Sequence, residues 1–160
     1  MTHFDITVPV RWSDVDGYGH VNNATMLRLL EEARIRAFWM PSDEQQALGA
    51  PLAPTALPAF APGNGVHTVV ASNRVEYLRE LGHRMDGVVV RMGLSRIGGA
   101  SLTLDYQVLT ADDPEGDAPY AIARTVLVMV SATTKQARRL SAEDRSTLEQ
   151  YMIEPLRFRD

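Results

Sequence analysis

The sequence predicts an α+β fold in which an antiparallel sheet of five strands is wrapped around one long central helix, with a minor helix near the C-terminus. Two observations lead to this fold class. Five segments alternate between apolar and polar residues with the period of two that a half-buried strand shows. One segment, residues 23–40, has the period of a helix and is apolar around most of its circumference. Such a helix must be enclosed, and a curled sheet encloses it economically.

Length and composition suit one compact domain. The 160 residues are 45% hydrophobic and 22% charged, and we expect a single domain over residues 1–160. The formal net charge of −4 gives no electrostatic reason to expect nucleic acid as a partner. The lack of cysteine excludes disulfides and thiolate chemistry and suits a cytoplasmic protein. The alternating N-terminus is unlike a signal peptide, and no apolar run approaches the ~18 residues that span a bilayer, so no membrane partner is expected.

The first expected strand covers residues 4–12. Alternate residues form its apolar face: Phe4, Ile6, Val8, Val10 and Trp12. Pro9 has no amide hydrogen to donate to a neighbouring strand. We therefore expect this strand at an edge of the sheet, or with a bulge at the proline.

The helix is expected from about Asn23 to Met40. Residues at helical spacing form its main apolar face: Met26, Leu27, Leu30, Ala33, Ala37 and Phe38. Three further apolar residues widen that surface: Leu29, Ile35 and Trp39. Burial on several sides is therefore expected. Charged residues at i, i+4 spacing, which favours ion pairs, follow another face: Arg28, Glu32 and Arg36.

Residues 41–65 contain five of the nine prolines, which forbid a long helix or a central strand there. We expect an irregular excursion in this segment. Its alanines, leucines and Phe60 are too apolar for a freely solvated linker. The excursion would therefore pack against the domain as a lid or the wall of a pocket.

Four more strands are expected after the excursion. One face of each carries, in chain order, Val69, Ala71, Asn73, Val75 and Tyr77; Val88, Val90, Met92 and Leu94; Leu102, Leu104, Tyr106 and Val108; and Ile122, Val126, Val128 and Val130. Turn signals separate these segments, so successive antiparallel strands are expected. The last strand is apolar on both faces, which favours a central position. A short helix should begin at Ser141, where Asp144 completes a capping box.

The connection between the first strand and the helix is rich in polar residues and glycines. Residues 11–25 read RWSDVDGYGHVNNAT, whereas a plain connection needs only a turn and a cap. Gly17 and Gly19 would let the backbone turn sharply and approach a ligand closely. The N-terminus of the following helix presents unpaired amides and the positive end of its dipole. This junction can therefore stabilise a developing oxyanion.

The segment RWSDVDGYGHVNNATMLRLLEEAR, residues 11–34, resembles the hot-dog-fold thioesterases of the 4-hydroxybenzoyl-CoA thioesterase type. More narrowly, it is similar to the acyl-CoA and acyl-carrier-protein thioesterases of that superfamily. Three later segments agree in order and spacing: NRVEYLREL, SRIGGASLTLDYQVL and ARTVLVMVSATTKQARRLS. The resemblance implies a hot-dog fold and the hydrolysis of an acyl thioester to free acid and CoA, without a cofactor.

Asp16 matches the catalytic aspartate of the family, so the resemblance assigns it the central role. It would act as a general base on water or as a nucleophile that forms a mixed anhydride, and both routes remain open. Backbone amides near Asn22 and Asn23 would hold the oxyanion, with Asn23 assigned to catalysis. Gly19, His20 and Asn22 are the candidates for substrate contact.

Each of these residues also has a purely structural interpretation. Asp16 could form an Asx-turn, and Asn22 or Asn23 could simply cap the helix. Asp14 more readily supports the turn or pairs with Arg11. His20 could instead pack at a subunit contact. The other histidines are too scattered to predict a metal site: His3, His67 and His83.

The expected partners are an acyl-CoA, or an acyl carrier protein in its place, and further copies of the chain. The resemblance implies a homodimer or homotetramer with the site at the dimer interface. The identity of the acyl group and the arginines that would bind the CoA phosphates stay open. Two alternatives remain: a non-catalytic acyl-CoA binding or regulatory protein, and a hot-dog hydratase or dehydratase.

Overall fold

The structure is a computed structural model, and it describes residues 2–39, 43–49 and 63–159. Its strands are β1 (Phe4–Val8), β2 (Val66–Tyr77), β3 (Val88–Ile97), β4 (Ser101–Leu109) and β5 (Ala121–Ser131). Its helices are α1 (Asn23–Phe38), α2 (Asp43–Ala47) and α3 (Ala142–Glu149), and a 3₁₀ turn covers Trp12–Asp14. None of the helices in these ranges is long and apolar enough to cross a membrane.

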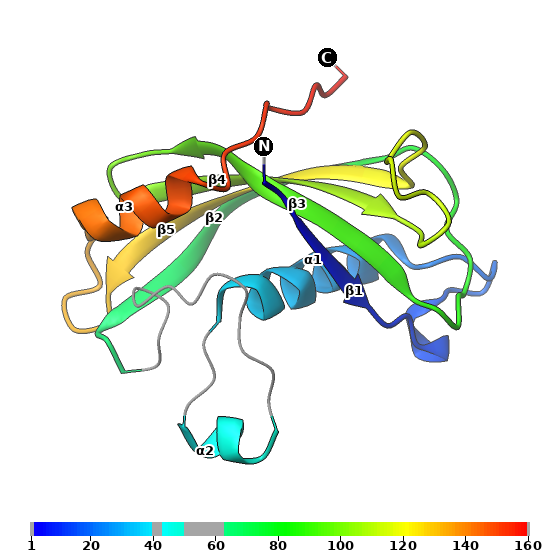
Figure 1. The fold of residues 1–160 in the computed structure, drawn as a ribbon. Helices are drawn as coiled ribbons and strands as arrows, with labels where there is room; N and C mark the ends of the chain where they lie inside the picture. The colour runs from blue at the N-terminus through cyan, green and yellow to red at the C-terminus, as the bar shows by residue number, and fades with distance from the viewer. Residues whose placement is uncertain (1, 40–42, 50–62, 160) are drawn as a thin grey trace.

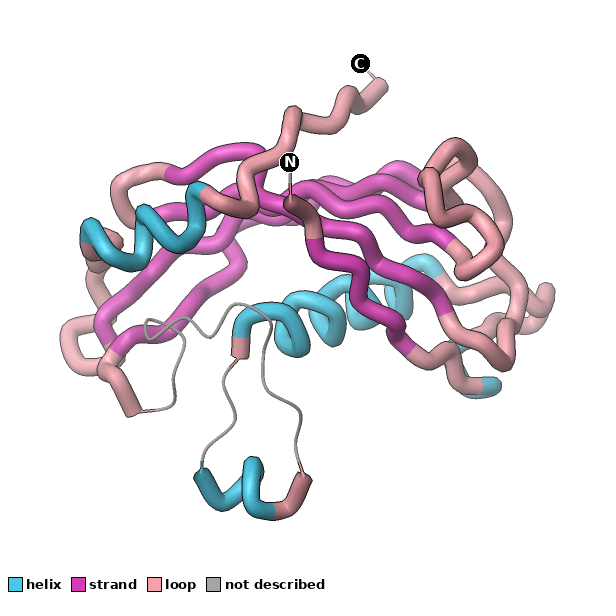
Figure 2. The backbone as a smooth tube through the Cα atoms, viewed as in Figure 1, coloured by secondary structure: helices cyan, strands magenta, loops and turns pink. Residues whose placement is uncertain are grey.

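The five strands form one antiparallel sheet in the order β1-β3-β4-β5-β2. The sheet curves over α1, which lies along its concave face (Figures 1 and 2). The predicted α+β architecture is therefore confirmed. Strands β3, β4 and β5 pair with their neighbours in the chain, but β2 does not pair with β3. It crosses to the far edge of the sheet and pairs with β5.

β1 lies at the other edge, as Pro9 predicts, but it is shorter than expected. Its last pair joins Val8 to Val88, and the ladder stops before the proline, which cannot donate a hydrogen bond. Val10 is buried beyond the end of the strand. Trp12 was expected on the apolar strand face, and that prediction is wrong. Trp12 lies in the 3₁₀ turn, is 76% exposed and meets the His83 ring edge-on.

α1 begins and ends close to the predicted limits and buries one broad face against the sheet. Its buried residues are Met26, Leu29, Leu30, Ala33, Ala37 and Phe38. The described residues of one chain, however, do not bury the helix on several sides. Leu27, Ile35 and Trp39 are 38%, 39% and 52% exposed. The described part of one chain therefore leaves an apolar strip of α1 facing solvent.

β2 has a different face pattern from the one the sequence predicts. A register shift between Val70 and Ser72 interrupts its pairing with β5. Such a bulge reverses the alternation, so Val69 lies on the opposite face from Asn73. β5 lies between β4 and β2, so its predicted interior position is confirmed. The middle strand of the sheet is β4.

The C-terminal part of the chain is held by specific caps and contacts. Ser141 caps α3 by accepting a hydrogen bond from the Asp144 amide at 3.0 Å, as the capping-box pattern predicts. Met152 and Ile153 then lie beside β3 just beyond the start of β1, where the amide of Ile153 donates to the carbonyl of Leu94 at 2.8 Å. α2 is a single short helix in the proline-rich excursion. Residues 50–62, which carry most of the expected pocket wall, lie outside the described ranges.

Candidate active site

The loop between β1 and α1 is a small hairpin closed by backbone hydrogen bonds. Val15 and Val21 form an isolated antiparallel bridge, and the Asp16 amide donates to the His20 carbonyl at 2.8 Å. Gly19 has φ +79°, a conformation that favours glycine, whereas Gly17 does not have a positive φ. The hairpin is anchored from outside because the Val21 amide donates to the Leu81 carbonyl at 2.6 Å.

Asp16 is held at the tip of this hairpin by its own neighbours. Its Oδ1 accepts hydrogen bonds from the amides of Tyr18 at 2.8 Å and His20 at 3.3 Å. This is the Asx-type arrangement that the structural interpretation expects. Oδ2 has no hydrogen-bond partner within the described residues. The carboxylate is half-buried and fixed in orientation, with one oxygen left to act on a ligand.

The N-terminus of α1 follows directly, and some of its polar groups already have hydrogen-bond partners. The Asn22 amide donates to the Asp14 carbonyl at 3.0 Å. The Ala24 amide donates to the side-chain oxygens of Asn22 and Asn23, both at 2.9 Å. The Asn23 amide has no acceptor among the residues that the structure describes. Only the Asn23 end of the expected pair of amides is thus left for an oxyanion, since the Asn22 amide already has an acceptor.

His20 and Asp14 have different surroundings. The Nε2 of His20 lies 3.4 Å from Oε2 of Glu80, whose side chain is 80% exposed. Asp14 is 1% exposed and accepts from the Arg11 amide at 2.7 Å and from the Arg11 guanidinium at 2.9 Å. The hydrogen bonds and charge of Arg11 hold the pKa of Asp14 below its usual range. Asp14 therefore supports the turn, as the sequence predicts.

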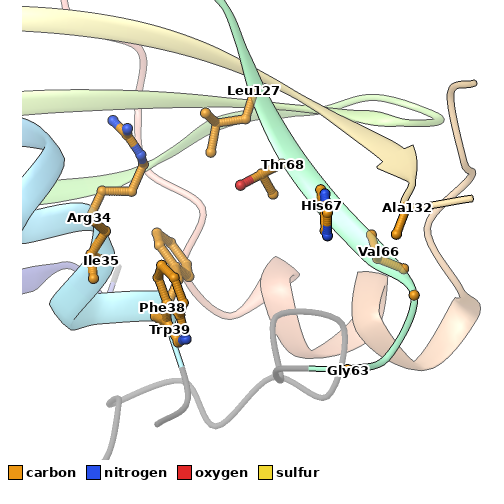
Figure 3. A pocket seen from close by; sticks show the side chains of 11 residues that line it. Arg34, Ile35, Phe38, Trp39, Gly63, Val66, His67, Thr68, Leu127 and Ala132 are labelled. Atoms are coloured by element: carbon orange, nitrogen blue, oxygen red, sulfur yellow. The ribbon is translucent and has the colours of Figure 1, made fainter. Parts of the chain in front are cut away.

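A cleft of about 620 Å³ opens between α1 and β2 at the other end of the helix (Figure 3). Its first lining residue on α1, Arg34, comes eleven residues after Asn23, so the cleft begins roughly 17 Å along the helix from its N-terminus. Within one chain, the Asp16 hairpin and the cleft are therefore separate. The cleft is lined by Arg34, Ile35, Phe38, Trp39, Gly63, Gly65, Val66, His67, Thr68, Leu127 and Ala132.

Sequence reasoning did not single out any of the polar residues of this cleft as a site residue. Arg34 is the most unusual of them, because its side chain is only 12% exposed. A signal was present in the helical spacing. Arg34 follows Leu30 by four residues and precedes Ala37 by three, and both of those are buried. A charged residue such as Arg34 on the buried side of an apolar helix is a candidate for ligand binding or catalysis.

Comparison with known proteins adds an independent observation. Residues 10–149 match the Thioesterase-like superfamily. The Bacillus subtilis (strain 168) protein YsmA is 31% identical over 144 residues, which are 88% of this chain and 82% of YsmA.

Solved structures are similar over nearly the whole chain. A thioesterase from Thermus thermophilus, complexed with coenzyme A and Zn, is 29% identical with a TM-score of 0.64, over 95% of this chain and 96% of that one. A protein from Bacillus stearothermophilus, described as a predicted thioesterase, is 23% identical with a TM-score of 0.71, over 96% and 99% of the two chains. The latter likeness shows the fold alone.

Proposed function

Because the chain belongs to the thioesterase-like superfamily, we propose that it hydrolyses acyl-CoA thioesters with Asp16 as the catalytic carboxylate. The resemblance in residues 11–34 is confirmed at the level of the superfamily, and the five-stranded sheet over α1 is its hot-dog fold. One observation carries the proposal. A carboxylate fixed by two backbone amides lies in the short loop that leads into α1. The Asn23 amide at the start of that helix has no acceptor among the described residues.

The proposed chemistry uses these two groups in complementary roles. The free oxygen of Asp16 takes a proton from water, whose oxygen attacks the thioester carbonyl carbon. The carbonyl oxygen becomes an oxyanion, which the Asn23 amide and the positive end of α1 stabilise. The C–S bond then breaks, and the CoA sulfur leaves and takes up the proton. In the alternative route, an Asp16 oxygen attacks the carbonyl carbon, the C–S bond breaks and the CoA thiolate leaves with a proton from water. Water then hydrolyses the mixed anhydride to the free acid and the Asp16 carboxylate.

We further propose that the active unit contains at least two chains. β2 is an edge strand of 12 residues, most of them exposed, and such an edge is a template for pairing with another strand. The exposed strip on α1 lies on the concave side of the same sheet. Pairing two copies of β2 about a two-fold axis would remove the edge and bring this apolar strip toward the partner.

This pairing would also bring the two halves of the site together. The Tyr77 hydroxyl donates to the Asn23 carbonyl at 2.7 Å, so the end of β2 lies at the start of α1. His67 and Thr68, at the start of β2, line the cleft with Phe38 at the end of α1. In an antiparallel pair, the start of the partner's β2 lies beside the end of this one. The cleft of one chain would then adjoin the Asp16 hairpin of the other.

The test is hydrolysis of a panel of short, long and aromatic acyl-CoAs by wild type and Asp16→Asn, with the released thiol followed by a chromogenic disulfide. Asp117→Asn is a matched control, because Asp117 is an exposed carboxylate on the loop between β4 and β5. We expect Asp16→Asn to lower kcat by ~10² or more while Asp117→Asn changes little. Equal rates in all three proteins would refute the role of Asp16. Tight acyl-CoA binding without turnover in wild type would favour a binding protein instead.

A further inference from the structure

Among the described residues, the lining of the cleft at the end of α1 combines apolar side chains with the nearly buried guanidinium of Arg34. Phe38, Trp39 and Leu127 are among its apolar lining residues. Arg34 extends from α1 toward the sheet on the side of Leu127 (Figure 3). A guanidinium in such surroundings is costly unless its donors are well paired. The number and length of the hydrogen bonds that Arg34 makes within the protein therefore indicate whether it has donors left to bind a ligand in the cleft.

Those hydrogen bonds are few and long. Nη1 lies 3.5 Å from the Tyr106 hydroxyl, and Nη2 lies 3.4 Å from Oε1 of Glu31, whose side chain is 57% exposed. A guanidinium has five N–H donors in a planar fork. Within the described residues, its Nε donor makes no hydrogen bond. Arg34 is thus held in place with much of its hydrogen-bonding capacity unused.

The Tyr106 hydroxyl, to which Arg34 donates, belongs to a group of polar side chains within the sheet. Tyr106 is fully buried in β4, and the Thr125 side chain lies close to its hydroxyl. Thr125 in turn donates to Oδ1 of Asn73 on β2 at 2.8 Å. This chain of polar groups crosses three neighbouring strands, β4, β5 and β2. Full burial holds the Tyr106 side chain in place, which limits where the guanidinium of Arg34 can lie.

We propose that this cleft binds an acyl group with an apolar body and a terminal carboxylate, and that Arg34 recognises the carboxylate. This inference rests on the proposed thioesterase function and names its substrate class, the CoA thioesters of dicarboxylic acids. The fork of an arginine matches a carboxylate through two parallel hydrogen bonds. A plain alkyl chain would fill the cleft but leave the donors of Arg34 unpaired and shielded from water, which disfavours it.

Matched thioesters test the proposal: suberoyl-CoA against octanoyl-CoA, and adipoyl-CoA against hexanoyl-CoA. The variants are Arg34→Met, which keeps the length of the side chain without its charge, and Arg34→Gln, which keeps a shorter donor. Arg36→Met is the control, because Arg36 is a partly exposed arginine paired with Glu32 at 2.9 Å. We expect wild type and Arg36→Met to prefer the carboxylated partner of each pair by roughly 10- to 100-fold in kcat/KM.

In Arg34→Met this preference should be lost, and in Arg34→Gln it should be reduced, while octanoyl-CoA is still hydrolysed. Wild type that prefers octanoyl-CoA, or an Arg34→Met variant that keeps the wild-type preference, would overturn the proposal. Binding of free suberate and free octanoate, measured by calorimetry, separates this proposal from the proposed function. Binding of suberate that depends on Arg34 supports the cleft assignment even if no thioester is hydrolysed. Hydrolysis of thioesters without any preference for a terminal carboxylate refutes the role of Arg34 and leaves the proposed thioesterase function standing.

Discussion

Asp105 offers a direct test of how the outer face of the sheet is held together. It is fully buried, and its carboxylate accepts hydrogen bonds from Nε and Nη2 of Arg124, both at 2.6 Å. It also accepts from the Ser95 hydroxyl at 3.0 Å and from the Leu156 amide at 2.8 Å. One side chain thus ties β3, β4 and β5 to the C-terminal segment. Arg124 has a raised pKa because of its hydrogen bonds to Asp105.

The substitution Asp105→Ala removes all four of these hydrogen bonds and leaves Arg124 without its counter-ion. Removing one partner of a buried pair costs about 3–5 kcal/mol. Because the Arg124 side chain is 31% exposed and can regain water, we expect the lower end, about 3 kcal/mol. For a domain of this size, that corresponds to a fall in Tm of about 6–12 °C.

The assay is thermal unfolding followed by circular dichroism at one fixed protein concentration. Amide hydrogen exchange of Leu156 reports release of the C-terminal segment separately. Asp86→Ala is the control, since Asp86 pairs with Arg84 at 2.7 Å on the surface, and its Tm should stay close to wild type. A fall of less than about 2 °C for Asp105→Ala would refute the reasoning, because that size is typical of an exposed pair.

Two further predictions concern the Asp16 hairpin and the β2 edge. Arg11 lowers the pKa of Asp14 in the folded state. The Asp14 carboxylate therefore stabilises the fold above the usual carboxylate pKa of about 3.9, and this stabilisation is lost as the pH falls through the lowered pKa. The Tm of wild type should therefore fall more steeply than that of Asp14→Asn on acidification below about pH 4, and parallel curves would contradict this. The double substitution Val69→Lys with Val70→Lys places like charges on the exposed edge, so sedimentation velocity should show monomers, with a matching loss of activity. Leu48→Lys, at a residue 83% exposed outside the sheet, should stay associated, and an unchanged oligomer in the double variant would refute pairing through β2.

Much of the architecture can be read from local patterns. The helical period of residues 23–38, the alternation in β3 and β4 and the cap at Ser141 each depend on neighbours within a few residues, which sequence displays directly. Pro9 likewise locates the edge position of β1, because a missing amide hydrogen is a property of the residue itself. The polar loop that carries Asp16 also stands out in the sequence, since a plain connection does not need its residues.

Other features depend on contacts between residues that are far apart in the chain. β2 could have paired with β3, its successor, and only the burial of the whole sheet over α1 decides that it pairs with β5. The bulge after Val70 moves the residues that follow it in β2 to the opposite face of the sheet, and the alternation of residues in the sequence does not reveal it. The unused amide at Asn23 is distinguished from the occupied one at Asn22 only by the Asp14 carbonyl across the hairpin.

The same limit applies to the cleft. A charged residue on a helix says nothing by itself about its exposure, and Arg34 is enclosed only because β2, β4 and β5 arrive around it from residues 66–131. Asp105 and Arg124 likewise meet through a register set by two paired strands. Periodicity reports the local backbone and the average side of burial, whereas the partners of a buried polar group follow from how the whole chain packs.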